Sequence, residues 1–216
     1  MHIFFTTIII KVFPLFAAIV LHEIAHGLMA YFLGDDTAKR EGRFNLHTHF
    51  DFYGSFVIPL ALYLLNSPFL IGYAKPIPIN QNNFKDPLSD MALVAIAGPL
   101  CNLLMAAGAA FLIQHTHTIW QEIILQMMLN FMVINLAVMF FNLIPIPPLD
   151  ASRLLAAVMP KAWVEKFYII EPFGCFIVIS LDLFTSQLSR LMGSQFSLFY
   201  LFIHRPVRGM MEFLLS

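Results

Sequence analysis

The residues HEIAH, at positions 22–26, place two imidazoles and a carboxylate at a spacing that suits metal-dependent hydrolysis. His22 and His26 are four residues apart, so on a helix they share one face and both can reach a single metal ion. Glu23 lies one position further round the helix and can contact a water molecule held by that metal without being a ligand. The pattern predicts that the histidines bind zinc and that Glu23 is the general base of a metalloprotease.

The residues around this group indicate where it lies. The stretch LFAAIVLHEIAHGLMAYFLG, residues 15–34, is as apolar as a membrane-spanning helix. An ionisable side chain in the middle of a membrane costs about 2.5–3.5 kcal/mol on insertion scales and usually marks a function. A polar cluster that only packs helices together is the alternative, and the complete HExxH pattern favours a metal site.

A catalytic zinc ion typically has three protein ligands and a water molecule, so a third ligand is expected elsewhere in the chain. The candidate is Asp150 in FNLIPIPPLDASRLL, because a proline-rich extended segment after a long apolar run can direct a carboxylate back into a helix bundle. Taken alone, Asp150 is equally well explained as the N-cap of a helix over residues 151–158. The two roles are compatible.

The composition indicates an integral membrane protein. Of the 216 residues, 59% are hydrophobic and only 12% are charged, whereas about a quarter of the residues in a soluble domain are charged. The net charge is −1 and there is no basic run, so nucleic acid is not expected as a partner. Cys101 and Cys175 both lie in apolar segments and are expected to be free thiols.

We predict one membrane domain over residues 1–216, an all-α polytopic fold with about six transmembrane helices and short re-entrant or strand-like loops. The 72–87 segment, GYAKPIPINQNNFKDP, is predicted to be an extended loop, and GRFNLHTHF at 42–50 alternates weakly like a short strand. The final stretch is either a sixth, tilted span or an interfacial helix. The expected spans cover about 12–33, 52–71, 88–113, 123–144, 164–184 and 190–216.

Three motifs occur in an order that resembles a known family. HEIAH in an apolar helix, AGPLCNLL at 97–104 and NLIPIPPLD at 142–150 look like the site-2 proteases, which are zinc-dependent intramembrane peptidases. DDTAKREGRFNLHTHFDFYGS at 35–55 and GYAKPIPIN at 72–80 are similar to the compact prokaryotic members that lack a PDZ domain. The resemblance covers roughly residues 12–185.

The resemblance implies roles for particular residues. It implies that one Zn²⁺ ion per chain is bound by His22, His26 and Asp150, and that Glu23 is the catalytic base. It also suggests that Asn102 and Asn142 line the site, where either could donate to a developing oxyanion or hold the substrate backbone; interhelical hydrogen bonding is the alternative for both. The family usually has glycine after the aspartate, and Ala151 stands here. Alanine suits helical geometry, so we expect function to be retained.

The function implied is an endopeptidase that hydrolyses peptide bonds within or near transmembrane segments, either to release a regulator or to clear signal-peptide remnants. Its partners would be a membrane-embedded protein or peptide substrate and the lipid bilayer, in a multi-pass arrangement in a prokaryotic plasma membrane. The oligomeric state is open, a homo-oligomer included. Segments 43–49 and 75–80 could pair with an unwound substrate by strand addition, or be ordinary connecting loops.

A metal transporter or channel that uses the same cluster is an alternative from a different class. It predicts acidic or histidine residues along several spans, but Asp182 is the only other carboxylate well inside a predicted span. A catalytically inactive homologue would be expected to have lost one of the motif residues. All four of them are present: His22, Glu23, His26 and Asp150.

Overall fold

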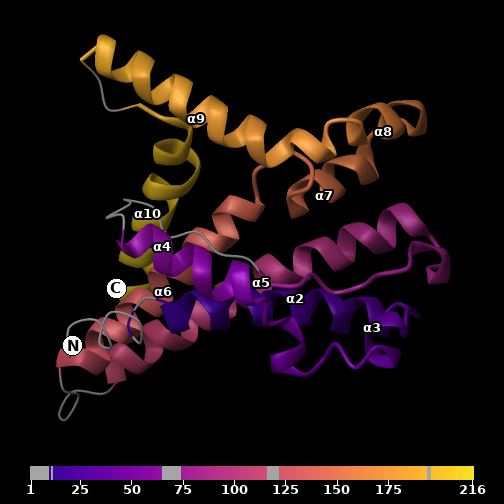
Figure 1. Cartoon of the computed structure of the whole chain (residues 1–216), viewed down its shortest axis with the longest axis horizontal. Helices are drawn as coiled ribbons and strands as arrows, with labels where there is room; N and C mark the ends of the chain where they lie inside the picture. Colours follow the sequence, from indigo (N-terminus) through magenta and orange to yellow (C-terminus); the bar gives the residue numbers. More distant parts are fainter. Residues whose placement is uncertain (1–9, 11, 65–73, 116–121, 194–195) are drawn as a thin grey trace.

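The computed structural model describes residues 10, 12–64, 74–115, 122–193 and 196–216, and the elements in these ranges are all helical (Figure 1). This confirms the all-α fold class. The four longest helices are α2 (Phe13–Phe32), α5 (Pro87–His115), α6 (Glu122–Asn142) and α9 (Gly174–Leu191). The shorter elements are α3 (Thr37–Arg40), η2 (Leu46–His49), η3 (Phe52–Val57), α4 (Ile58–Leu64), η4 (Gln81–Asn83), α7 (Asp150–Val158), α8 (Lys161–Tyr168), η5 (Glu171–Phe173), η6 (Tyr200–His204) and α10 (Arg205–Leu215).

Four stretches of the described residues are long and apolar enough to cross a membrane, so the chain is a membrane protein. Three of them match expected spans to within a few residues, whereas the fourth is longer than the span expected at 164–184 and includes α8, η5 and α9. Of the span expected at 52–71, residues 65–73 lie outside the described residues. The number of six spans stays a prediction. The four stretches are Phe13–Phe32, Pro87–His115, Ile124–Asn142 and Lys161–Leu191.

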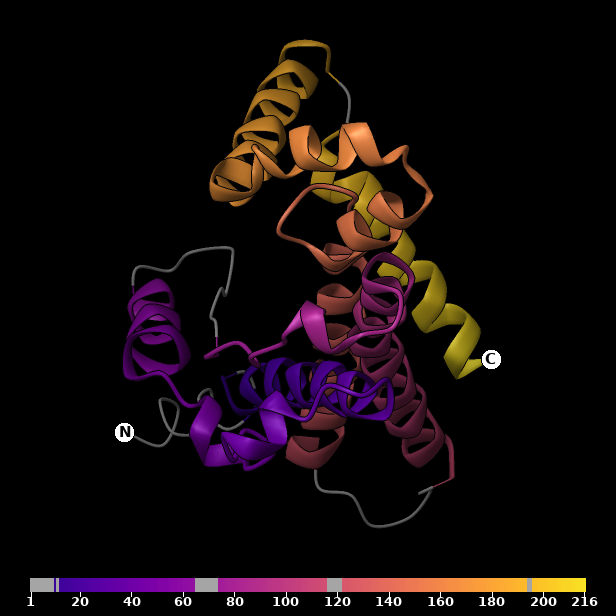
Figure 2. The same cartoon turned by 90° about the vertical axis from the view of Figure 1, so that its right-hand side faces the viewer.

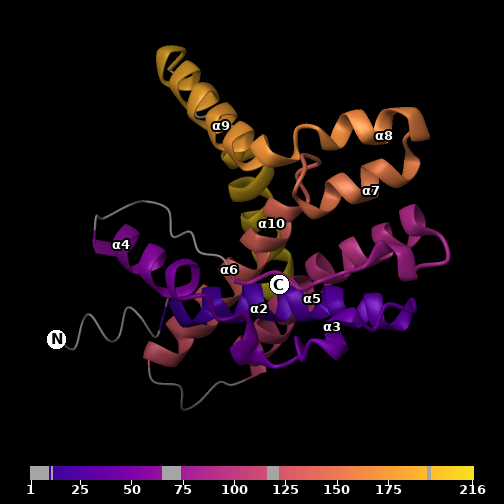
Figure 3. The ribbon, with the colours of Figure 1, turned by 45° about the vertical axis from the view of Figure 1, so that its right-hand side comes forward.

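Helices α2, α5 and α6 pack against one another and form the centre of the molecule (Figure 3). Small side chains on α5 make this possible: Ala106, Ala109 and Ala110 are buried against Met132 and Leu136 of α6. Where the surroundings are apolar, helices associate by close packing, so small residues at the interface are favourable.

The C-terminal stretch adds a short helix to this core. Helix α10 packs against α5 and α6 through Val207, and Gln114 Nε2 donates to the carbonyl oxygen of Leu214 at 3.2 Å. Residues 198–215 are helical without a break, through η6 into α10, and this stretch is not one of the four candidate spans. The expected sixth span or interfacial helix at 190–216 stays a prediction. Helix α9, by contrast, projects away from α2 in both Figures 1 and 2.

The loop after α2 determines how the chain leaves the helix that carries HEIAH. Gly34 has a φ of 110°, which glycine adopts without a steric penalty. Its N–H donates to Tyr31 O at 3.2 Å, and the Asp35 N–H donates to Ala30 O at 2.9 Å. These two bonds form a Schellman motif. The motif ends the helix and places Asp35, which is fully buried, beside it.

The short strand predicted over 42–50 is wrong, because this segment curls on itself. Leu46–His49 is a 3-10 turn. Arg43 Nη1 donates to Thr48 O at 2.7 Å, and His49 Nε2 lies 2.6 Å from Arg43 O. Weak alternation of residue types carries no information about these side-chain bonds to the backbone. Of the extended loop predicted at 72–87, residues 74–80 lie outside any helix, as predicted, whereas Gln81–Asn83 forms the 3-10 turn η4 and residues 72–73 lie outside the described residues.

Candidate metal centre

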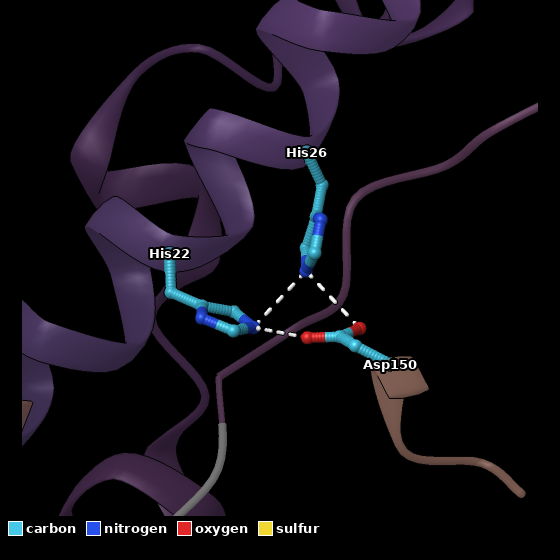
Figure 4. A group of neighbouring side chains, drawn as sticks. All are labelled: His22, His26 and Asp150. Atoms are coloured by element: carbon cyan, nitrogen blue, oxygen red, sulfur yellow. Dashed lines mark hydrogen bonds and ion pairs between the residues drawn. The ribbon is translucent and has the colours of Figure 1, made fainter. Parts of the chain in front are cut away.

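The two histidines of HEIAH meet Asp150, which is more than 120 positions away in the chain (Figure 4). His22 Nε2 lies 3.0 Å from His26 Nε2 and 3.1 Å from Asp150 Oδ2, and His26 Nε2 lies 3.3 Å from Asp150 Oδ1. Both imidazoles are buried, and the Asp150 side chain is 13% exposed. In the described part of the chain, this is the group of potential metal ligands that comes together.

Asp150 reaches the histidines because it is the first residue of α7. Leu149 is the N-cap of this helix and makes no side-chain capping bond. The alternative role of Asp150 as an N-cap is therefore not the one that the structure shows. Gly174 packs so closely on Pro147 that an added Cβ would overlap the Pro147 carbonyl oxygen. This contact holds the proline segment against α9 just before Asp150. Ala151 is in the first turn of α7, where it has helical geometry.

Hydrogen bonds on the far side of each ring determine which nitrogen faces Asp150. His26 Nδ1 lies 2.7 Å from Val94 O, which can only accept, so Nδ1 carries the hydrogen. His22 Nδ1 lies 2.6 Å from Asn102 Oδ1. The Asn102 amide nitrogen already donates to Ala18 O and to Asn135 Oδ1, so its oxygen faces the ring and His22 Nδ1 also donates. In the neutral form of each ring, Nε2 therefore carries the lone pair, and both Nε2 atoms face Asp150.

Asn135 was missed in the sequence analysis. It is fully buried on α6, accepts from Asn102 Nδ2 at 2.9 Å, and donates to Phe131 O at 2.8 Å. It thereby fixes the amide orientation on which the His22 hydrogen bond depends. A polar amide in the middle of an otherwise apolar helix is a signal that could have identified it.

The donor set fits a zinc ion. Two Nε2 lone pairs and a carboxylate at 3.0–3.3 Å repel one another unless a metal ion or a proton lies between them. Zinc bonds of about 2.0–2.1 Å in a tetrahedron put neighbouring ligand atoms about 3.3 Å apart, close to these separations. Asp150 Oδ2 is buried and has no hydrogen-bond donor among the residues that the structure describes. A buried carboxylate oxygen without a donor is costly, and a metal ion would satisfy it.

Helix α5 can approach these rings only because residue 98 is glycine. A Cβ on Gly98 would lie 2.5 Å from His26 Nε2 and 2.6 Å from His22 Cε1. The GPLCN motif thus contributes both the space that the imidazoles occupy and, through Asn102, the hydrogen bond that orients one of them.

Glu23 lies beside the three candidate ligands and is not one of them. Its Oε2 accepts a hydrogen bond of 2.9 Å from the N–H of Ile77, in the extended 74–80 segment. One carboxylate oxygen is held by the backbone in this way.

Asn142 donates to Val138 O one turn earlier in α6, at 3.1 Å. A role for Asn142 at the site stays a prediction. Asn102 contacts His22, and its expected contact with substrate likewise stays a prediction.

These features define a class of protein: a membrane protein with a buried His–His–Asp centre and an adjacent carboxylate, the donor set of a zinc hydrolase. A curated protein of Bacillus subtilis (strain 168), named "Putative zinc metalloprotease YwhC", is 34% identical to this chain over 186 residues. The similarity covers 82% of this chain and 80% of that protein.

The chain therefore belongs to the family of this zinc metalloprotease, consistent with the compact site-2 protease-like family that its motifs resemble. No family model and no solved structure matches the chain.

Proposed function

We propose that this protein is a zinc-dependent intramembrane endopeptidase that hydrolyses peptide bonds within or near transmembrane segments of membrane proteins. The observation that carries the proposal is that His22, His26 and Asp150 converge. The two histidines and Glu23 are on helix α2, which is long and apolar enough to cross a membrane. The family membership supports the protease activity. The depth of the site within a lipid bilayer, in a multi-pass prokaryotic plasma-membrane protein, is part of the proposal.

The residues have distinct tasks in such a reaction. A zinc ion held by His22, His26 and Asp150 supplies Lewis-acid activation of water and of a peptide carbonyl group. The Glu23 carboxylate takes the proton of the attacking water and returns it to the nitrogen of the leaving amine. Asn102 keeps the His22 Nε2 lone pair directed at the centre. Asn142 remains our candidate for holding the substrate backbone.

The location in an apolar helix explains the need for this chemistry there. The peptide bonds of a transmembrane helix are shielded from water, and their backbone groups are already hydrogen-bonded within the helix. Hydrolysis then requires local unwinding of the substrate and a polar site at the same depth. The buried ligands and the partly buried Glu23 are placed in a manner that suits this requirement.

The test is a Glu23→Gln variant, purified beside wild type and a Glu165→Gln control, in which an exposed glutamate on α8 undergoes the same chemical change. Each protein is reconstituted into liposomes with a single-helix transmembrane substrate, and the products are mapped by mass spectrometry. We expect Glu23→Gln to keep its zinc, measured by elemental analysis, while cleavage falls by about 10²–10⁴-fold. Glu165→Gln should cleave at the wild-type rate.

Other outcomes would overturn the proposal. Cleavage by Glu23→Gln at the wild-type rate would remove the assignment of the base. Cleavage sites confined to soluble loops would remove the intramembrane part of the proposal. Zinc flux into the liposomes that depends on Asp150, without cleavage of any helical substrate, would favour the transporter. Asp150→Ala should lose bound zinc, and full zinc content in this variant would contradict the ligand set.

A further inference from the structure

The extended 74–80 segment passes over the helix that carries Glu23 and forms a backbone hydrogen bond with it. That contact is the 2.9 Å hydrogen bond from the Ile77 N–H to Glu23 Oε2. Pro76 and Pro78, on either side of Ile77, have no N–H. The neighbouring residues of the segment therefore offer the carboxylate no alternative donor, and the bond depends on the position of Ile77 itself.

The end of this segment is held by Asp35. Asp35 Oδ2 accepts from the Asn80 N–H at 2.7 Å, and Oδ1 accepts from Asn83 Nδ2 at 2.6 Å and from the backbone and hydroxyl of Thr37. The carboxylate is fully buried. Burial alone would raise the pKa of Asp35, but the hydrogen bonds from Thr37, Asn80 and Asn83 outweigh burial and lower it. The charged form is the one that holds the segment.

The start of the segment is held by the loop that follows α3. Arg43 Nη2 donates to Lys75 O at 3.0 Å and to Pro76 O at 2.7 Å. The Lys75 N–H donates to His49 O at 2.9 Å, and the buried His49 ring lies 3.0 Å from Lys75 O. These bonds and those of Asp35 hold both sides of Ile77.

The middle of the segment rests directly on α2. An added Cβ on Gly27 would overlap the side chain of Ile77 and lie 3.0 Å from Phe44. Gly27 is therefore small enough to let Ile77 lie against the helix, one residue after His26. Ile77 is 8% exposed. The height of its N–H above Glu23 is set by this contact.

We propose that the 74–80 segment positions the general base and that Asp35, which never touches the metal centre, is the positioning residue that keeps the Ile77 N–H on Glu23. The inference rests on the proposed role of Glu23 as base. With Oε2 held by the backbone, the orientation of the side chain is restricted, and Oε1 remains available to accept the proton of the attacking water. Displacing a catalytic group by about 1 Å can cost about 10²-fold in rate.

The decisive variant is Asp35→Asn. The NH2 group of asparagine cannot accept a hydrogen bond, so part of the donor set of Thr37, Asn80 and Asn83 loses its acceptor. We expect kcat to fall by about 10- to 100-fold, with KM within about twofold of wild type and zinc content unchanged. Amide hydrogen exchange at Ile77, measured by mass spectrometry on metal-loaded protein without substrate, should become at least about tenfold faster.

A matched control is Asp182→Asn, which also removes a buried carboxylate that accepts a backbone N–H, here that of Phe199 at 2.8 Å. Asp182 is on α9, away from α2 (Figure 1). This variant should leave kcat and the exchange rate at Ile77 unchanged even if it lowers the unfolding temperature. If Asp35→Asn folds poorly, Arg43→Lys tests the other end of the segment with the same readouts, since lysine cannot form the two-carbonyl contact.

A second background separates positioning from general loss of structure. The shorter side chain of Glu23→Asp does not reach the Ile77 N–H, so adding Asp35→Asn there should change the residual rate by less than about twofold. An equal loss of rate in both backgrounds, a wild-type kcat in Asp35→Asn, or unchanged exchange at Ile77 would overturn the inference. If Glu23→Gln is inactive while Asp35→Asn is normal, the proposed function stands and only this inference fails.

Discussion

At the scale of single residues, the candidate metal centre depends on the missing side chain of a glycine as well as on the ligands themselves. Gly98 leaves the volume in which both imidazole rings lie, and its own chemistry contributes nothing to metal binding. The rings are then oriented by Val94 O and Asn102 Oδ1. Partners that orient a ligand in this way typically change metal affinity by about 10–100-fold when they are removed.

Gly98→Ala should therefore weaken zinc binding, because the Cβ of the alanine would push the His22 and His26 rings out of the positions in which both Nε2 atoms face Asp150. The matched control is Gly108→Ala on the same helix, where an added Cβ has no neighbour within 4 Å. That control should be neutral or should stabilise α5 by up to about 1 kcal/mol, as expected for glycine to alanine in a helix. Zinc affinity is measured by competition with a chelating dye. Equal affinities in the two variants would contradict this account.

At the scale of elements, α7 positions Asp150 by starting at that residue. A carboxylate in the first turn also interacts favourably with the helix dipole. The helical backbone at Ala151 explains why alanine is compatible with the site, although the site-2 proteases, which the motifs resemble, usually have glycine there. The residue is helical and buried, so no left-handed conformation is required.

Ala151→Gly tests this explanation. We expect the variant to lose about 0.5–1 kcal/mol of stability, because glycine is less favourable than alanine in a helix and the buried methyl group is lost. Zinc content and kcat should not change. The measurements are thermal unfolding and elemental analysis. A gain in stability or in zinc affinity would indicate that the backbone at Ala151 is strained, contrary to the structure.

At the scale of the whole molecule, one small centre connects parts of the chain that are distant in sequence. Asp150 of α7 meets the histidines of α2, while α5 and α6 supply the amides of Asn102 and Asn135 behind them. A ligand that binds only the folded state stabilises it in proportion to the logarithm of its free concentration. Zinc should therefore stabilise the fold as well as provide the chemistry.

Removal of zinc by a chelator should lower the unfolding temperature of wild type by several degrees. At a free zinc concentration of about 100 times Kd, binding contributes about 2.7 kcal/mol, and about 2–4 °C per kcal/mol is typical for this size. Asp150→Ala should show little response to zinc, whereas Glu23→Gln should respond like wild type. Tryptophan fluorescence follows the transition. A response of Asp150→Ala equal to that of wild type would contradict the ligand assignment.

Much of the fold followed from local patterns, and the exceptions have a common cause. Long apolar runs predicted α2, α5 and α6 to within a few residues because burial in lipid requires a helix of a certain length. The predicted strand at 42–50 failed because Arg43 and His49 bond to backbone carbonyl groups, which pulls the segment into a turn. Such bonds depend on geometry that alternation of residue types does not encode.

The sequence by itself determined that His22, Glu23 and His26 occupy neighbouring positions on one apolar helix, because helical spacing is a local property. Only the tertiary structure decided that Asp150 faces them, that Asn135 supports Asn102, and that Ile77 holds Glu23. These contacts join residues between 33 and 128 positions apart. They arise from the packing of α2, α5, α6 and α7 and from the anchoring of the 74–80 segment, and neither is expressed in residue spacing.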